Sequence, residues 1–271
     1  MCGRVNVSDH GGITALLAMM GMQTWPLSPA RFNVAPSGVL DVVKIDPDSS
    51  LSDDSTGGRL TLSKMTWGFT SYSKQAQSKR LINARSETVF SKPSFSESAR
   101  QRRAIVVING FYEWHVDKQG QRRAFYISLT NTPAMALAAV YQNRPVIKTS
   151  THKTSTDKCD IQMSLDLHDE HTPVPDVPTQ PNTIDKQVCI LTREANQQMQ
   201  AIHHRMPLII NSEQAQQWLN LDDKGKDRDH FFQNQANLDS ALTIRQVDGY
   251  VNRTTNEGVK CLASAGTKVD W

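Results

Sequence analysis

The chain has 271 residues, with 30 basic and 27 acidic side chains and a formal net charge of +3 at neutral pH. This mild positive balance is compatible with a polyanionic partner but does not indicate one. No apolar run reaches about 18 residues, and no basic region followed by an apolar core marks a signal peptide. We therefore expect neither a membrane-spanning helix nor secretion, and we predict an intracellular, cytoplasmic protein.

Apolar periodicity predicts a series of short elements in the first half of the chain. The spacing over residues 12–22 predicts an amphipathic helix. Short apolar or alternating runs predict strands at residues 39–45, 60–66, 104–108, 124–129 and 134–140. The last two runs are separated by Thr130-Asn131-Thr132-Pro133, which is a turn signal, so we expect them to be antiparallel neighbours.

A polar segment interrupts the second half of the chain. Residues 149–186 contain four prolines and few large apolar groups, which predicts a flexible insertion within a single domain spanning residues 1–271. After it we expect a strand at 188–192, a helix at 194–202, an extended run at 208–210 and a helix with Ser212 as its N-cap. Many short strands without regular βαβ alternation predict an α+β fold with a largely antiparallel sheet.

The cysteines give little sign of a metal site or a disulfide framework. They are widely separated, and no Cys-x-x-Cys pair occurs among Cys2, Cys159, Cys189 and Cys261. Cys189 lies in an apolar run and is expected in the core. His168 and His171 have ligand-like spacing, but their segment is polar and offers no third ligand, so we expect a solvated loop.

Cys2 directly follows the initiator methionine. Removal of Met1 would leave a terminus with an α-amine and a thiol two carbons apart, both of which titrate near neutral pH. Such a 1,2-aminothiol condenses with an aldehyde to an imine and then closes a five-membered thiazolidine ring. An internal cysteine lacks this chemistry.

Three other segments hold polar groups that an ordinary core or loop does not require. Residues 81–88 place Asn83, Arg85 and Glu87 at alternate positions after an apolar pair. Residues 109–114 hold the carboxyl of Glu113 among aromatic residues, surroundings that raise a carboxyl pKa. Residues 201–207 crowd two histidines and an arginine between a helix and a strand. Each segment alone is a weak signal.

Taken together and in this order, the segments resemble the SOS response-associated peptidase (SRAP) family, whose members crosslink themselves to abasic sites in single-stranded DNA. The resemblance extends over nearly the whole chain. It rests on Cys-Gly-Arg at 2–4, Arg-Phe-Asn-Val-Ala-Pro at 31–36, Trp-Gly-Phe at 67–69, Ile-Asn-Ala-Arg-Ser-Glu-Thr at 82–88, Gly-Phe-Tyr-Glu-Trp at 110–114, Ile-His-His-Arg-Met-Pro at 202–207 and Val-Asn-Arg at 251–253.

The resemblance implies a single SRAP-like domain with a barrel-like β core. It places the catalytic groups at Cys2, Asn83, Glu113 and His203. The DNA-binding positions that it implies are Arg4, Asn33, Pro36, Tyr72, Arg85, Trp114 and Arg205, of which Arg85 and Arg205 match phosphate contacts. It further implies a monomeric DNA-repair protein with no metal or organic cofactor and no membrane partner, nucleoid-associated if the source is bacterial.

The chain departs from the family pattern in three segments. After Trp-Gly-Phe the family often has a Pro-containing loop with aromatic residues that wedge against DNA, whereas here only Tyr72 is available for stacking. His204 stands where Asp or another polar residue is common, and the insertion is longer than a compact member needs. These departures concern the preference among DNA junctions rather than the chemistry at Cys2.

By this resemblance the Cys2 amine attacks the C1′ aldehyde of the ring-opened abasic sugar, and the thiol closes the ring. Glu113 and His203 exchange protons, and Asn83 orients Cys2. One alternative is a cysteine peptidase or amidohydrolase that uses Cys2, with self-cleavage after Met1 as a version that is compatible with crosslinking. Another is a non-catalytic single-strand DNA binding module that stacks bases on its aromatic residues.

Overall fold

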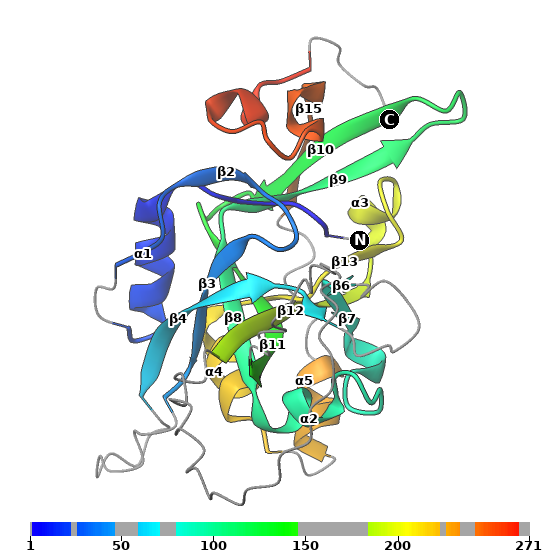
Figure 1. Cartoon of the computed structure of the whole chain (residues 1–271). Helices are drawn as coiled ribbons and strands as arrows, with labels where there is room; N and C mark the ends of the chain where they lie inside the picture. The colour runs from blue at the N-terminus through cyan, green and yellow to red at the C-terminus, as the bar shows by residue number, and fades with distance from the viewer. Residues whose placement is uncertain are drawn as a thin grey trace, which may run out of the picture.

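A computed structural model describes residues 2–22, 26–46, 59–70, 80–145, 184–222, 226–233 and 242–265 (Figure 1). The described strands are β1 (Val5–Val7), β2 (Arg31–Val34), β3 (Val39–Ile45), β4 (Leu60–Trp67), β5 (Phe69–Thr70), β6 (Arg80–Leu81), β7 (Asn83–Arg85), β8 (Arg103–Ile108), β9 (Gly110–Val116), β10 (Arg122–Leu129), β11 (Met135–Pro145), β12 (Ile184–Glu194), β13 (Arg205–Pro207), β14 (Ile209–Ile210) and β15 (Leu242–Val247). The described helices are α1 (His10–Met19), α2 (Ser96–Gln101), α3 (Gln197–Gln200), α4 (Ser212–Asn220) and α5 (Lys226–Gln233), and the 3-10 helices are η2 (Ser86–Thr88), η4 (Gly249–Asn252) and η5 (Val259–Leu262).

Five strands close into a barrel. They follow the order β12, β4, β3, β8 and β11, and β11 pairs back onto β12. The pairing is antiparallel throughout the barrel except between β12 and β4, which run parallel. The strands β7, β13 and β14 add to this sheet at its margins. The structure therefore confirms the predicted α+β class with a largely antiparallel, barrel-like β core.

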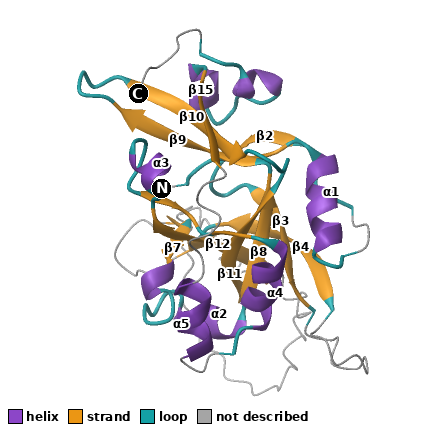
Figure 2. Cartoon of the chain, turned by 180° about the vertical axis from the view of Figure 1, so that it is seen from behind, coloured by secondary structure: helices purple, strands orange, loops and turns teal. Residues whose placement is uncertain are grey.

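A second antiparallel sheet lies across one end of the barrel. Its order is β15, β10, β9, β1 and β2, so the amino-terminal strand β1 is an internal strand with a partner on each side. The hairpin of β9 and β10 projects from this sheet, and α2, α4 and α5 gather at the opposite end of the molecule (Figures 1 and 2). The start of the chain is therefore held between the two sheets rather than left as a free tail.

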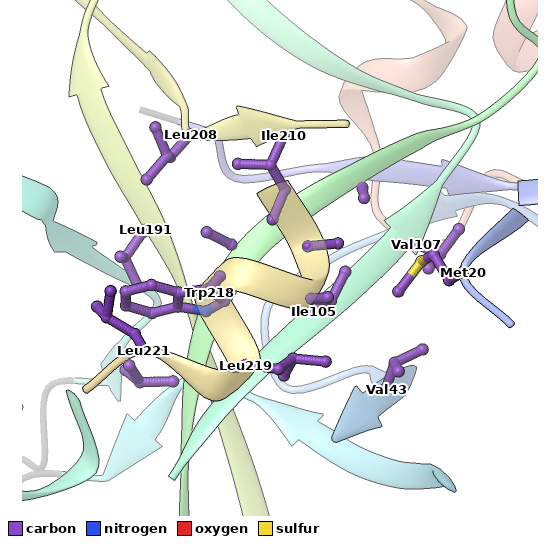
Figure 3. Packing of buried hydrophobic residues seen from close by; sticks show 14 of the residues in the cluster. Met20, Val43, Ile105, Val107, Leu191, Leu208, Ile210, Trp218, Leu219 and Leu221 are labelled. Carbon is purple, nitrogen blue, oxygen red and sulfur yellow. The ribbon is translucent and has the colours of Figure 1, made fainter. Parts of the chain in front are cut away.

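Alternate residues of the barrel strands pack into two hydrophobic clusters, as the two-residue period of a strand requires. Val43, Ile105 and Leu191 join one cluster with the helices (Figure 3). Val42, Val106 and Ile190, one position away on the same strands, join the other cluster with Val5, Phe111 and Phe125 of the second sheet. The barrel is thus packed against helices on one side and against the second sheet on the other.

Trp218 of α4 anchors the helix side of the barrel (Figure 3). Its ring is fully buried, and its Nε1–H faces the carbonyl oxygens of Ala104 at 3.0 Å and Ala139 at 3.1 Å. Phe231 of α5 stacks on the same ring with 5.4 Å between centroids. The indole therefore fills the interface and supplies a hydrogen-bond donor that a phenyl ring lacks.

Most predicted strands are confirmed, but one predicted pairing is wrong. The strand predicted at 39–45 has these bounds in the structure, and the one predicted at 60–66 extends one residue further, to Trp67. The strands at 124–129 and 134–140 are not neighbours. β10 pairs with β9 and β15, whereas β11 pairs with β8, β12 and β14. The turn around Pro133 carries the chain from one sheet to the other, and the Pro133 carbonyl accepts a hydrogen bond from Asn109.

Three helices differ from the predictions, two of them because of capping. α1 begins at His10, since Asp9 accepts a hydrogen bond from the Gly12 N–H and acts as N-cap. α4 is capped by Asn211 rather than by Ser212, with Gln214 completing a capping box. The helix predicted over 194–202 is a single turn, α3, because β12 continues to Glu194.

The predicted insertion at 149–186 lies largely outside the described residues. The strands that flank it, β11 and β12, pair directly from Ala139–Ile190 to Pro145–Ile184. The described strands on either side of the segment therefore belong to the same sheet. No helix in the described part of the chain is long and apolar enough to cross a membrane.

Replacement of Trp218 tests how much the helix layer contributes to stability. Because the ring is fully buried, Trp218→Ala should lower the free energy of unfolding by about 3–5 kcal/mol in urea titrations. Trp218→Phe keeps most of the buried area but loses the indole N–H, and should cost less. Equal, small effects of both substitutions would show that the interface does not depend on this ring.

Candidate active site

The position of Cys2 is fixed by strand β1. Val5 lies opposite Phe111 and Asn6 opposite Gly110, and the Tyr112 N–H donates to the Arg4 carbonyl at 2.9 Å. Continuing this antiparallel register toward the start of the chain leads past Glu113. The pairing of β1 with β9 therefore aligns the amino-terminal residues with the carboxylate-bearing part of β9.

Cys2 is fully buried and is held from a second direction by Asn83. The Asn83 Nδ2 donates to the Cys2 carbonyl oxygen at 2.8 Å. Asn83 begins β7, which pairs in parallel with β12 through Asn83–Ile190 and Arg85–Thr192. The structure thus brings together Cys2 and Asn83, two residues that the sequence analysis selected 81 positions apart.

Glu113 is the buried carboxylate of the site, with 3% of its surface exposed. Burial raises the pKa of the Glu113 carboxyl, which confirms the direction expected from the sequence. Not all of the flanking aromatic residues contribute to the burial of this carboxyl, because side chains alternate along β9. Phe111 packs in the cluster that contains Cys2, whereas Tyr112 and Trp114 belong to a different cluster.

The Cys2 thiol is held in its protonated form. Burial raises the pKa of the thiol, and the neighbouring Glu113 carboxylate raises it further. A thiolate at this position would lose its hydration and face a like charge. The site therefore contains a neutral thiol next to a carboxyl group that exchanges protons closer to neutral pH than an exposed glutamate does.

His203 lies between α3 and β13 and is half-buried. Its Nδ1 lies 2.9 Å from the backbone nitrogen of Arg205 and 3.1 Å from the Arg205 carbonyl oxygen. The ring stacks on His204 with 4.4 Å between centroids. Burial lowers the pKa of His203, so the neutral imidazole predominates at pH 7.

One stretch of β12 brings these segments to the same edge of the barrel. Thr192 pairs with Arg85 of β7 on one side and with Pro207 of β13 on the other. In both overall views the amino-terminal end of the chain lies beside α3 (Figures 1 and 2). The segments that carry Cys2, Asn83, Glu113 and His203 therefore converge.

The expected phosphate contact of Arg205 is not supported by its surroundings. Only 7% of its side chain is exposed, and its Nη1 and Nη2 contact the two carboxylate oxygens of Glu87 at 2.7 and 2.9 Å. Nη2 also donates to the Thr192 carbonyl at 2.6 Å. The guanidinium is therefore held in an internal ion pair, and the phosphate contact that the resemblance implies for Arg205 stays a prediction.

Arg4 and Asn33 also differ from the expected groove-lining residues, because both are buried. Arg4 donates to the Asn33 Oδ1 at 2.7 Å and to the Val251 carbonyl at 3.0 Å. The Asn33 Nδ2 in turn faces the carbonyl oxygens of Val251, Arg253 and Asn256 at 2.8–3.3 Å. These two side chains tie β1 and β2 to the carboxy-terminal segment around η4.

The remaining DNA-binding positions have varied surroundings. Arg85 is exposed, and Pro36 is half-buried in the turn between β2 and β3. Trp114 is half-buried, with the guanidinium of Arg4 5.4 Å and that of Arg122 4.9 Å from its ring centre. Tyr72 lies outside the described residues.

The sequence analysis missed two residues that surround the site. Arg122 was not selected as a site residue, but its guanidinium lies over the ring of Trp114. Glu87 was noted only for its alternating position, yet it is the partner of Arg205. A cleft of about 1,030 Å³ opens beside Glu87 and is lined by Ser86, Phe90, Arg100, Arg193, Arg228 and Phe232, among others. Among the described residues, no three His, Cys, Asp or Glu side chains gather as metal ligands would.

Comparison with known proteins identifies the family. The SOS response associated peptidase (SRAP) family matches residues 1–254, so the chain belongs to this family. Its relatives include YoqW and YoaM of Bacillus subtilis strain 168, which are named abasic site processing proteins. YoqW is 25% identical over 237 residues, which are 86% of this chain and 85% of YoqW. YoaM is 28% identical over 193 residues, which are 70% of this chain and 65% of YoaM.

Solved structures share the fold. A protein from Bacteroides thetaiotaomicron superposes with a TM-score of 0.65 at 17% identity, covering 97% of this chain and 100% of its own. A protein from Bordetella bronchiseptica gives a TM-score of 0.59 at 13% identity, covering 91% of this chain and 100% of its own. At these identities the likeness establishes the barrel-and-sheet architecture alone.

The buried Glu113 carboxyl should destabilise the folded protein at neutral pH. Its pKa is raised on folding, so the unfolded chain loses this proton first, and stability falls as pH rises from about 4.3 toward the raised value. Glu113→Gln removes this effect and should raise the melting temperature at pH 7 by at least about 2 °C. The two proteins should converge at acidic pH. A variant that is less stable at pH 7 would contradict the assignment.

Proposed function

We propose that this protein processes abasic sites in single-stranded DNA by forming a covalent crosslink through Cys2 after Met1 has been removed. The observation that carries the proposal is the convergence of a buried Cys2, the amide of Asn83 and the buried carboxyl of Glu113. Membership of the SRAP family and the names of the Bacillus relatives, which are abasic site processing proteins, support it.

The reaction has two bond-forming steps. The α-amine of Cys2 adds to the C1′ aldehyde of the ring-opened sugar, and loss of one water gives an imine. The Cys2 sulfur then adds to the imine carbon while the thiol proton passes to nitrogen, which closes a thiazolidine. Because both nucleophiles belong to one fixed residue, the second step is intramolecular and has a high effective concentration.

Each neighbouring group has a role that its surroundings support. The raised pKa of Glu113 suits a carboxylate that accepts a proton from the amine near neutral pH. His203, neutral at pH 7 because burial lowers its pKa, exchanges protons with the sugar oxygen during ring opening and imine formation. Asn83 holds the Cys2 carbonyl and so orients the aminothiol.

The DNA strand is bound by charge and stacking rather than by sequence. Arg85 is exposed at the end of β7, two residues after Asn83, in a position to contact a flanking phosphate. Trp114, with Arg4 and Arg122 against its ring, offers an aromatic surface for a base on the projecting hairpin. Both kinds of contact tolerate any base sequence.

The protonated Cys2 thiol favours crosslinking over general peptidase activity. A cysteine peptidase attacks with a thiolate, and burial together with Glu113 disfavours that form here. In the proposed reaction the amine attacks first, and the thiol is needed only for ring closure. The buried thiol therefore fits the order of steps in thiazolidine formation.

Cys2 is the residue whose replacement tests the proposal. Cys2→Ala, or an acetylated Cys2 amine, should abolish the heat-stable adduct with an abasic oligonucleotide in denaturing electrophoresis, because ring closure needs both groups. Cys2→Ser should form only an imine that borohydride traps. Cys261→Ala is the matched thiol control and should crosslink like wild type. An undiminished adduct with Cys2→Ala would refute the proposal.

Arg85 tests the path of the DNA. If Arg85 contacts one phosphate, Arg85→Ala should weaken binding and reduce the slope of log K against log salt by about one unit. The crosslink yield should recover at high DNA concentration, because the chemistry at Cys2 is unchanged. Arg102, paired with Glu97 on α2, is the control position and its alanine variant should leave the slope unaltered. An unchanged slope with Arg85→Ala would place the strand elsewhere.

A further inference from the structure

The ion pair between Arg205 and Glu87 joins two segments that flank the site. Glu87 lies in η2, directly after β7, and Arg205 begins β13. The two carboxylate oxygens meet the two terminal nitrogens of the guanidinium at 2.7 and 2.9 Å. This bidentate geometry fixes both the distance and the orientation of the Arg205 side chain.

The backbone of the same arginine faces the imidazole of His203. Its N–H lies 2.9 Å and its carbonyl oxygen 3.1 Å from the Nδ1 atom. A neutral ring with its proton on Nε2 accepts at Nδ1 from the N–H, whereas a protonated ring donates from Nδ1 to the carbonyl. The N–H and the carbonyl of Arg205, which belong to consecutive peptide groups, therefore serve both protonation states without rotation of the ring.

We propose that Glu87 is a positioning residue for His203: by holding Arg205, it keeps the Arg205 peptide against Nδ1 and leaves Nε2 as the atom that exchanges protons in the site. Glu87 does not touch the reacting atoms. This inference rests on the proposed function, in which His203 transfers protons during ring opening and imine formation.

Burial makes the dependence of Arg205 on Glu87 strong. With 7% of its side chain exposed, the guanidinium is largely removed from water, and a buried charge that loses its partner is strongly destabilising. Partial burial raises the pKa of Glu87, but the hydrogen bonds and charge of Arg205 outweigh it and hold that pKa below its usual range. Glu87 is therefore ionised at neutral pH, when Arg205 needs it.

Without the carboxylate, hydration would favour rotation of the guanidinium toward water. The strand β13 that carries Arg205 has only three residues, so its pairing restrains such a movement weakly. The Thr192 carbonyl oxygen would still accept a hydrogen bond from the guanidinium, but from Nη2 only. A shift of the Arg205 peptide would release Nδ1, so that the imidazole gains a second tautomer and a second orientation.

The test compares Glu87→Gln, which keeps the shape and loses the charge, with Glu87→Asp, which keeps the charge. Glu97→Gln removes the surface ion pair with Arg102 and is the matched control. Crosslinking is followed at saturating abasic oligonucleotide and at low concentration, to separate the maximum rate from DNA affinity. The ¹⁵N shifts of the His203 ring, assigned with His203→Ala, report its tautomer in the free protein.

Glu87→Gln should lower the maximum crosslinking rate by about 10- to 100-fold, with DNA affinity within about twofold of wild type. Its His203 spectrum should lose the pure Nε2–H signature, whereas Glu87→Asp should largely restore both properties and Glu97→Gln should change neither. Should Glu87→Gln fail to fold, Arg205→Lys takes its place, because it keeps the positive charge but loses the bidentate contact.

An unchanged maximum rate and unchanged ring shifts in Glu87→Gln would overturn the inference. A loss of DNA affinity alone would also overturn it, since that result would return Arg205 and Glu87 to the DNA interface. If wild type forms no crosslink, the proposed function fails, while the ring shifts still decide whether Glu87 orients His203.

Discussion

The pairing of β1 inside the second sheet is the constraint on which the rest of the site depends. A chain start is usually the least ordered part of a domain, but here β1 has β2 on one side and β9 on the other. Arg4 and Asn33 reinforce it through the carbonyl of Val251, almost 250 positions away in the chain. Cys2 is consequently held as rigidly as a core residue, which the geometry of ring closure requires.

The site gathers charged groups where water is scarce, and this arrangement costs stability. The Glu113 carboxyl is buried beside a thiol, and the Arg205 guanidinium is buried against Glu87. In many proteins, hydrophobic residues of similar volume in place of a buried ion pair leave the stability unchanged or increase it. The two groups respond differently to burial. The charge of Arg205 is balanced by a bidentate partner, whereas burial raises the pKa of Glu113. The first arrangement fixes geometry, and the second suits the proton exchange that we propose for Glu113.

Local patterns predicted the elements, and family resemblance predicted the residues that converge. Alternation and β-branched residues mark β3 with its observed bounds, because those signals are local. The assignment of β10 and β11 to different sheets depends on partners far away in the chain and could not be found locally. Likewise, the sequence shows Arg205 beside two histidines, but only the fold brings Glu87 to it across 118 positions. A charged partner of this kind, here with 46% of its side chain exposed, gives an arginine an internal contact that the local sequence does not reveal.

The most direct test of the account is the mass of the adduct between wild-type protein and an abasic oligonucleotide. Thiazolidine formation joins the mature chain, without Met1, to the DNA with the loss of one water. Fragmentation should then place the modification on the amino-terminal cysteine, with the amine and the sulfur both substituted. An adduct that retains Met1, or that maps to a lysine or to another cysteine, would contradict the central claim.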